Sequence, residues 1–235
     1  SYFTHISDIT LLQSGVAVGT AISYDGSGQK VTGTIQNRTS NRFLFENIHM
    51  RGTTSVSTNG WNKHIVVNNG MNGIVDGCVV EGNYLTTPDA VQSASAFHYY
   101  GDGSPVAILT KNCYAYYVQD TVLADSIEGV FVDKCNFVAV NRGVKFTATG
   151  AEPQLLVTNS HISAFQYCIT AEQLTNGQIQ NNLLYARNDA VASVTLIYFG
   201  TNCDYCHVTN NTFKDQSTQT VVGIDIAGTS CQYNK

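Results

Sequence analysis

The residues of this chain with the clearest potential for catalysis are carboxylates in two short polar turns. Asp102 in "YYGDGSP" lies ten residues before Asn112, and Asp125 in "LADSIEG" lies nine residues before Lys134. Asn112 and Lys134 are equivalent positions of a repeat described below, and Glu128 follows Asp125 a turn later. Hydrolysis of a glycosidic bond generally uses two carboxylates about 5–10 Å apart. We therefore predict Asp102, Asp125 and Glu128 as the catalytic residues of a glycan-cleaving site. The alternative is that all three are solvated turn residues.

Aromatic and basic side chains near these acids are candidates for contacting a sugar. Flat aromatic faces bind sugars, and three such candidates stand directly before the first of the two turns. The single tryptophan lies in "TNGWNKHI", inside a long repeat whose excess length predicts a surface loop. The alternative for these aromatic residues is packing between coils or subunits. The predicted substrate-binding residues are Trp61, His98, Tyr99, Tyr100 and Lys145.

The sequence gives little support for a metal or a cofactor. "CDYC" (203–206), followed by His207, has the spacing of half a zinc site, but no second pair follows it. A thioredoxin-like motif would need a βα context that is also lacking. We therefore expect no metal and no cofactor.

Composition and charge narrow the class of protein. The chain has 235 residues, only 12% of them charged, and is rich in Asn, Gly, Thr, Ser and Val, which predicts an all-β protein. Its net charge of −5 argues against a nucleic-acid partner. No apolar run approaches the roughly 20 residues needed to insert into a membrane. Seven scattered cysteines, an odd number, suggest buried free thiols and folding in a reducing compartment.

A short polar interruption of strand-forming residues recurs seven times in the chain. The stretches are "FENIHM" (45–50), "VDGCVV" (75–80), "TKNCYA" (110–115), "FVDKCNFVAV" (131–140), "VTNSHI" (157–162), "IQNNLL" (179–184) and "VTNNTF" (208–213). Their register residues are Asn47, Gly77, Asn112, Lys134, Asn159, Asn181 and Asn210. Matched positions two before, one after and three after each register residue are mostly apolar. Inward residues of a flat strand are two apart, so the alternation slips by one residue here.

Such a slip keeps both sides buried only if the strand turns a sharp corner. Corners of this kind usually place one residue at positive φ, which Gly and Asn tolerate. Lys134 is the exception, and we predict that it adopts this conformation at a cost of about 1–2 kcal/mol. One position later, Cys78, Cys113 and Cys135 are predicted to stack as small buried side chains, with Cys231 continuing the column one repeat later.

A second strand-like stretch precedes most corners by about a dozen residues, as in "TVLAD" (121–125) and "TLIYFG" (195–200). Repeats of roughly 20–35 residues of this kind are typical of a solenoid. We predict an all-β, right-handed, single-stranded parallel β-helix over residues 31–235, with residues 1–30 as a lead-in segment or an irregular first coil. The alternative, a β-sandwich of short strands, predicts no matched columns. Neither end carries an obvious polar cap, so we expect a piece of a longer protein or capping by partner chains.

The Asn-rich corners resemble those of right-handed parallel β-helix proteins of the pectate-lyase-like superfamily, in which they form an Asn ladder. Within that superfamily the chain looks most like a bacteriophage tailspike or related tail appendage. The resemblance covers roughly residues 31–235 and rests on architecture, because we find no calcium-aspartate or arginine pattern of the pectate lyases. It implies a homotrimer on the virion tail, in contact with other tail components, assembled in the host cytoplasm and acting on bacterial surface polysaccharide (capsule or O-antigen).

Three functions fit these observations. The first is a tailspike-like receptor-binding protein that binds and hydrolyses a surface polysaccharide, and so acts as an endoglycosidase or depolymerase. The second is a purely structural or adhesive β-helix. The third is a polysaccharide lyase, in which His98 or Tyr99 with Lys145 would take a ring proton and hold the acidic sugar. The fold alone does not separate them.

Overall fold

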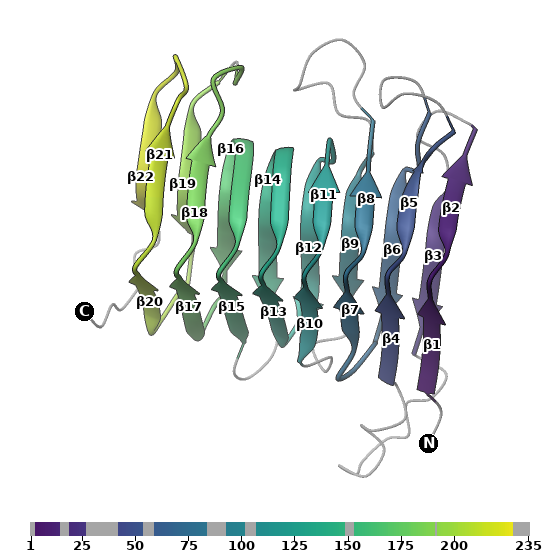
Figure 1. Cartoon of the computed structure of the whole chain (residues 1–235). Coiled ribbons are helices and arrows are strands. Elements are labelled where there is room, and N and C mark those ends of the chain that lie inside the picture. Colours follow the sequence, from purple (N-terminus) through teal and green to yellow (C-terminus); the bar gives the residue numbers. More distant parts are fainter. Residues whose placement is uncertain are drawn as a thin grey trace.

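The computed structural model of the chain describes residues 3–14, 19–26, 42–53, 59–83, 93–101, 107–148, 153–190 and 192–227. Within these ranges all regular structure is β-strand, and the strands pair in parallel throughout (Figure 1). This confirms the predicted all-β parallel solenoid. The described residues contain no helix long and apolar enough to cross a membrane.

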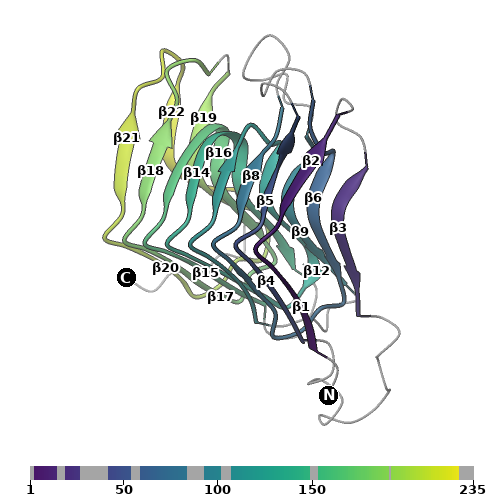
Figure 2. The same cartoon turned by 45° about the vertical axis from the view of Figure 1, so that its right-hand side comes forward.

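The strands form three rows that run along the solenoid axis (Figure 2). The first row is an eight-stranded sheet. In order it contains β1 (Phe3–Ser7), β4 (Arg42–Glu46), β7 (Ile74–Asp76), β10 (Ile108–Lys111), β13 (Gly129–Asp133), β15 (Gln154–Thr158), β17 (Asn176–Gln180) and β20 (Cys206–Thr209). Each of its strands enters one of the predicted corners or, for β1, the turn at Asp8.

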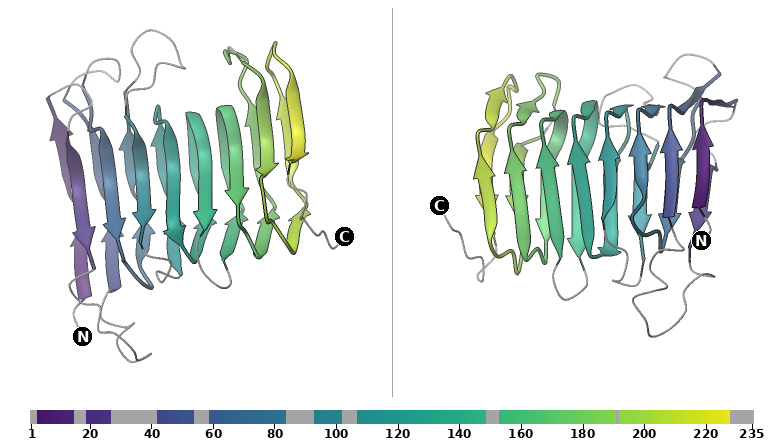
Figure 3. Two further views of the ribbon diagram at one scale, coloured as in Figure 1. Left: turned by 180° about the vertical axis from the view of Figure 1, so that it is seen from behind. Right: turned by 60° about the horizontal axis from the view of Figure 1, so that its bottom comes forward.

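The second and third rows belong to one larger sheet of 14 strands, because two long strands, β14 (Asn136–Ala148) and β16 (His161–Glu172), cross both rows. The second row also contains β2 (Thr10–Gln13), β5 (His49–Gly52), β8 (Val79–Glu81), β11 (Tyr114–Tyr116), β18 (Leu183–Ala186) and β21 (Thr212–Asp215). The third contains β3 (Thr20–Asp25), β6 (Lys63–Asn68), β9 (Ser95–Tyr100), β12 (Asp120–Ile127), β19 (Val194–Phe199) and β22 (Val221–Ile226). Figure 3 shows these coils stacked from one end of the molecule to the other.

The seven predicted corners all have the expected backbone conformation. The φ angles are 53° at Asn47, 61° at Gly77, 53° at Asn112, 53° at Lys134, 52° at Asn159, 58° at Asn181 and 54° at Asn210. Asp8, which the sequence did not single out, begins the series with φ 54°. The strands β1, β2 and β3 therefore form a first coil, and they pair with β4, β5 and β6.

The predicted columns are also neighbours in space. Val75 pairs with Phe45 on one side and with Thr110 on the other, and Val132 pairs with Val157. These rows face the interior, where one continuous apolar core runs through the coils. Fully burying a side chain of this kind stabilises the fold by about 1.5–3 kcal/mol.

The predicted thiol column lies in the same core. Cys78, Cys113 and Cys135 follow successive corners and are 0%, 0% and 3% exposed. Their thiols contact backbone carbonyl groups of the same and the preceding coil, as where Cys113 Sγ lies 3.6 Å from the oxygen of Val75. Cys231, predicted to continue the column, lies outside the described residues.

Polar side chains tie the corners of successive coils together. On the outside, Nδ2 of Asn112 donates to Oδ1 of Asp76 at 2.8 Å. On the inside, Oδ1 of Asn182 accepts from the backbone N–H of Ser160 at 2.9 Å, and Oδ1 of Asn211 accepts from that of Asn182 at 3.0 Å. The corners therefore carry side-chain hydrogen bonds from coil to coil in addition to the strand ladder.

The strain predicted at Lys134 can be measured. Asn adopts positive φ at a lower cost than Lys, so Lys134→Asn should raise the melting temperature by about 2–4 °C, corresponding to about 1 kcal/mol. The matched control is Lys214→Asn in β21, where the backbone is not at positive φ. A rise of similar size in the control, or no rise for Lys134→Asn in thermal denaturation followed by circular dichroism, would contradict a strained corner.

The buried imidazole of His64 makes the fold sensitive to acid. His64 is fully buried on β6, where its Nδ1 lies 2.9 Å from the carbonyl oxygen of Ser95. Burial lowers its pKa from 6.5 to about 4, and the carbonyl groups of Ser95 and Glu81 offset this only in part. Between these two pH values the unfolded chain binds a proton that the folded chain does not, so stability is lost as the pH falls.

We expect His64 to lower the free energy of unfolding by about 3 kcal/mol as the pH is lowered from 7 to 4. Replacing the imidazole in His64→Leu should therefore reduce the difference in melting temperature between pH 7 and pH 4. His49→Gln serves as the control, because His49 is half-buried and its ring already faces Glu81 at 2.9 Å. An unchanged pH dependence in His64→Leu would show that other groups account for acid sensitivity.

Candidate functional site

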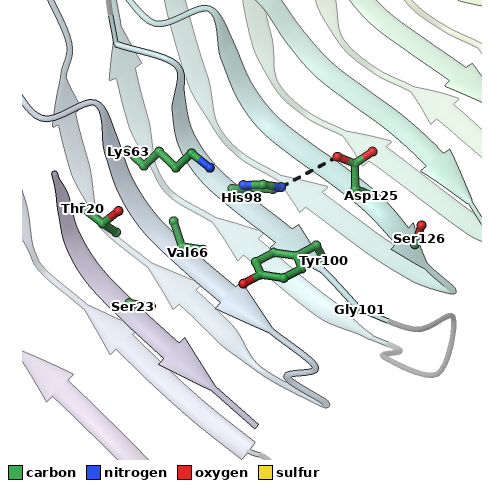
Figure 4. Close-up of a pocket in the computed structure, with 9 residues that line it drawn as sticks. All are labelled: Thr20, Ser23, Lys63, Val66, His98, Tyr100, Gly101, Asp125 and Ser126. Atoms are coloured by element: carbon green, nitrogen blue, oxygen red, sulfur yellow. Dashed lines mark ion pairs between the residues drawn. The ribbon is translucent and has the colours of Figure 1, made fainter. Parts of the chain in front are cut away.

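A groove opens on the outer face of the third row, across β3, β6, β9 and β12 (Figure 4). It has a volume of about 540 Å³. The residues that line it are Thr20, Ser23, Lys63, Val66, His98, Tyr100, Gly101, Asp125 and Ser126. It therefore combines one acid, two basic side chains and an aromatic ring on four consecutive coils.

Strand register decides which of these residues meet. His98 on β9 pairs with Val66 on β6 and with Leu123 on β12, and two residues later Tyr100 pairs with Asp125. Alternation along β9 turns His98 and Tyr100 outward into the groove and the intervening Tyr99 inward. The ring centroids of His98 and Tyr100 lie 5.1 Å apart.

The imidazole of His98 is far more enclosed than the carboxylate of Asp125 in the same groove. Its side chain is only 12% exposed, and its Nε2 lies 3.8 Å from Oδ2 of Asp125, beyond hydrogen-bond distance. Among the described residues neither ring nitrogen of His98 has a hydrogen-bond partner. A buried polar atom without a partner is costly, so an incoming polar group that pairs with it would be stabilised.

The charge state of His98 follows from its surroundings. Burial lowers its pKa first, and the positive charge of Lys63 lowers it further, while Asp125 acts in the opposite direction. The ring is therefore neutral at pH 7 and presents one donor and one acceptor nitrogen. Within reach of a bound sugar, such a ring can accept a proton or orient a hydroxyl group.

A second carboxylate on β12 has a structural role. Asp120 is 6% exposed and forms an ion pair with Arg142 on β14, whose Nη2 donates to Oδ2 at 2.9 Å and whose Nε lies 2.5 Å from Oδ1. Burial raises its pKa, and the charges of Arg142 and Lys145 oppose this rise. Because both of its oxygen atoms face Arg142, Asp120 fixes β12 against β14 and does not line the groove.

The structure brings together part of the residue set predicted from the sequence. His98, Tyr100 and Asp125 share the groove. Lys145 lies two coils beyond His98, because Leu123 in the coil between them pairs with both residues. Asp102 lies outside the described residues.

The remaining candidates lie elsewhere. Glu128 is half-buried on the link between β12 and β13, where its carbonyl oxygen accepts from Gln154, and it does not line the groove. Trp61 is partly buried against the core. Tyr99 is fully buried, with its hydroxyl group 2.7 Å from Oγ1 of Thr110, so its predicted contact with substrate does not fit this placement.

Two features of the groove escaped sequence analysis. The first is that Asp125 pairs with Tyr100 in the neighbouring coil. The next strands of the two coils pair at Ile108 and Val130, and the chain from Tyr100 to Ile108 is longer than the chain from Asp125 to Val130. Counting back from the corners therefore misaligned the two turns. The second is Lys63, whose ammonium group points toward His98 in Figure 4. Its position in "NKHIVV", as the first residue of a strand of the third row, was the signal that could have identified it.

No group of three or more metal-ligating side chains occurs within the described ranges. Comparison of the chain with protein-family models, curated proteins and solved structures finds no significant match. Function is therefore inferred from the geometry of the groove and from the fold.

The titration of His98 tests the electrostatics of the groove. Removing the neighbouring positive charge in Lys63→Gln should raise the pKa of His98, whereas Asp125→Asn should lower it. Both shifts can be read from the imidazole proton signals in an NMR titration, with His207 on β20 as an internal reference. Shifts of the opposite sign would contradict the described arrangement.

Proposed function

We propose that this protein is a tailspike-like receptor-binding β-helix that binds a bacterial surface polysaccharide in the groove around His98 and cleaves it by hydrolysis. The observation that carries the proposal is the convergence of His98, Tyr100 and Asp125 on one open outer face. The parallel β-helix supports it by analogy with the tailspikes that the sequence resembles, as a homotrimer on the virion tail.

The shape of the groove suits a chain-like ligand. It is open along the outer face and spans four coils, so consecutive sugar units of a polysaccharide can enter from the side and lie across several strands. The ring of Tyr100 is 37% exposed and offers an apolar face, while the unpartnered nitrogen atoms of His98 offer hydrogen bonds. Aromatic faces with a few convergent polar groups are the usual means of binding a sugar.

The chemistry assigned to the groove starts from Asp125. Its side chain is 47% exposed, so it can reach the oxygen or the anomeric carbon of a bound glycosidic bond. Hydrolysis requires a second carboxylate, and Asp102, two residues after the strand partner of Asp125, remains the predicted one. We assign to the neutral ring of His98 the role of orienting the sugar or the attacking water.

A second candidate function, a polysaccharide lyase, draws on the same groove. Elimination needs a base for a ring proton and a cation near the sugar carboxylate. His98 with Lys63 meets this description, since both line the groove and lie close enough for Lys63 to shift the pKa of His98. Hydrolysis produces a new reducing end without unsaturation, whereas elimination produces an unsaturated sugar, so the products separate the two reactions.

Incubation of the protein with purified capsules and O-antigens should release new reducing ends from one of them. Asp125→Asn should lower that rate by about a hundredfold or more while binding persists, because it removes the acid or base. Tyr100→Ala should weaken binding about tenfold through loss of the aromatic contact.

The control for both variants is Asp215→Asn on β21, which replaces an acid outside the groove and should leave the rate unchanged. Ultraviolet absorbance of an unsaturated product would identify a lyase. Cell binding with no product of either kind would support an adhesive β-helix. Unchanged cleavage by Asp125→Asn would remove Asp125 from the catalytic site.

A further inference from the structure

Two lysines on the same outer face have no carboxylate partner among the described residues. Lys63 on β6 lines the groove. Lys145 on β14 pairs with Leu123 on β12, which in turn pairs with His98 on β9. Within the part of the chain that the structure describes, neither forms an ion pair with an acid. Lys111 on the first row shows the contrast, because its Nζ lies 2.9 Å from Oδ2 of Asp76 in the preceding coil.

The fold could readily have paired these lysines with acids in adjacent coils, as it does for Lys111. Both Lys63 and Lys145 are half-buried, and their charges are felt by neighbouring groups, that of Lys63 at His98 and that of Lys145 at Asp120. Arg142, the other cation nearby, is already held by Asp120. The positive charges of Lys63 and Lys145 are therefore available to pair with a group outside the described residues. This holds although the chain as a whole carries a net charge of −5.

Strand register gives the spacing of the two charges. Lys63 pairs with Ser95 in the next coil, Ser95 pairs with Asp120, and Asp120 pairs with Arg142 on β14. Lys145 follows Arg142 by three residues on the same strand, so the two lysines are three coils apart. With strands about 4.8 Å apart, this separates them by about 14 Å along the axis. His98 and Asp125 lie on the two coils between them. A ligand that met both lysines would therefore pass directly over the candidate site.

From this arrangement we infer that the polysaccharide bound by this groove is acidic, with sugar carboxylates placed at intervals along its chain that meet Lys63 and Lys145. The inference rests on the proposed function, which it narrows from surface polysaccharides in general to those that contain uronic acids or similar carboxylated sugars. A lysine ammonium group binds carboxylate and phosphate alike as a point charge. Carboxylated sugars and phosphate-substituted glycans are therefore separated by experiment.

The test uses an array of purified bacterial surface polysaccharides that includes neutral, carboxylated and phosphate-substituted members. We expect the full chain to bind one or more carboxylated members. Reduction of the carboxylates of the bound polysaccharide to neutral alcohols, which leaves its linkages intact, should then weaken binding about tenfold or more.

Variants locate the effect on the protein. Lys63→Gln and Lys145→Gln should each weaken binding of the native polysaccharide about fivefold, and both should reduce the loss of binding caused by added salt. Lys111→Gln is the matched control, because it removes an equally half-buried lysine from another face and should leave affinity unchanged. Circular dichroism confirms that each variant retains its β-structure.

The outcomes separate the inference from the function it deepens. Equal binding of native and carboxyl-reduced polysaccharide, or binding only of neutral or phosphate-substituted members, would overturn the acidic ligand and leave polysaccharide binding standing. Sensitivity to carboxyl reduction with full affinity in both lysine variants would also overturn the inference, because the charge would then be read elsewhere. Binding to no member of the array would count against the proposed function itself.

Discussion

Parallel hydrogen bonding between consecutive coils is the constraint on which the rest of this structure depends. Each strand is paired on both sides in all but the end coils, so one residue's place in the register fixes its neighbours along the axis. The inward rows, such as Phe45, Val75 and Thr110, then form a continuous core. The same register fixes the outward rows, and the groove is one consequence of it.

The corners maintain that register. Eight residues at matched positions, from Asp8 to Asn210, adopt positive φ, and side-chain hydrogen bonds such as that from Asn112 to Asp76 cross from one coil to the next. A slip by one residue would turn every inward side chain outward. Corner geometry and core packing therefore favour the same alignment, and this agreement allows polar residues such as His98 and Asp125 to occupy defined places on the outside.

Much of the fold could be predicted from the sequence, and much less of the site. The matched columns depend on local spacing around each corner, which the positions of Asn47 and Asn159 reveal directly. The third row is separated from those corners by links of unequal length, so spacing along the chain did not show that Asp125 faces Tyr100 or that Lys63 approaches His98. The burial of Tyr99 was missed for a related reason, because three consecutive polar-aromatic residues can be sorted into inward and outward only when the register of β9 is known.

Coil stacking assembles His98, Tyr100 and Asp125 into one groove on the third row, which we propose binds a polysaccharide. A crystal structure of the protein with an oligosaccharide from its polysaccharide would test this claim most directly. We predict sugar units across β6, β9 and β12, in contact with His98 and Tyr100. An oligosaccharide bound instead on the second row, beside Tyr114 and Leu183, with the groove filled only by solvent, would contradict the account.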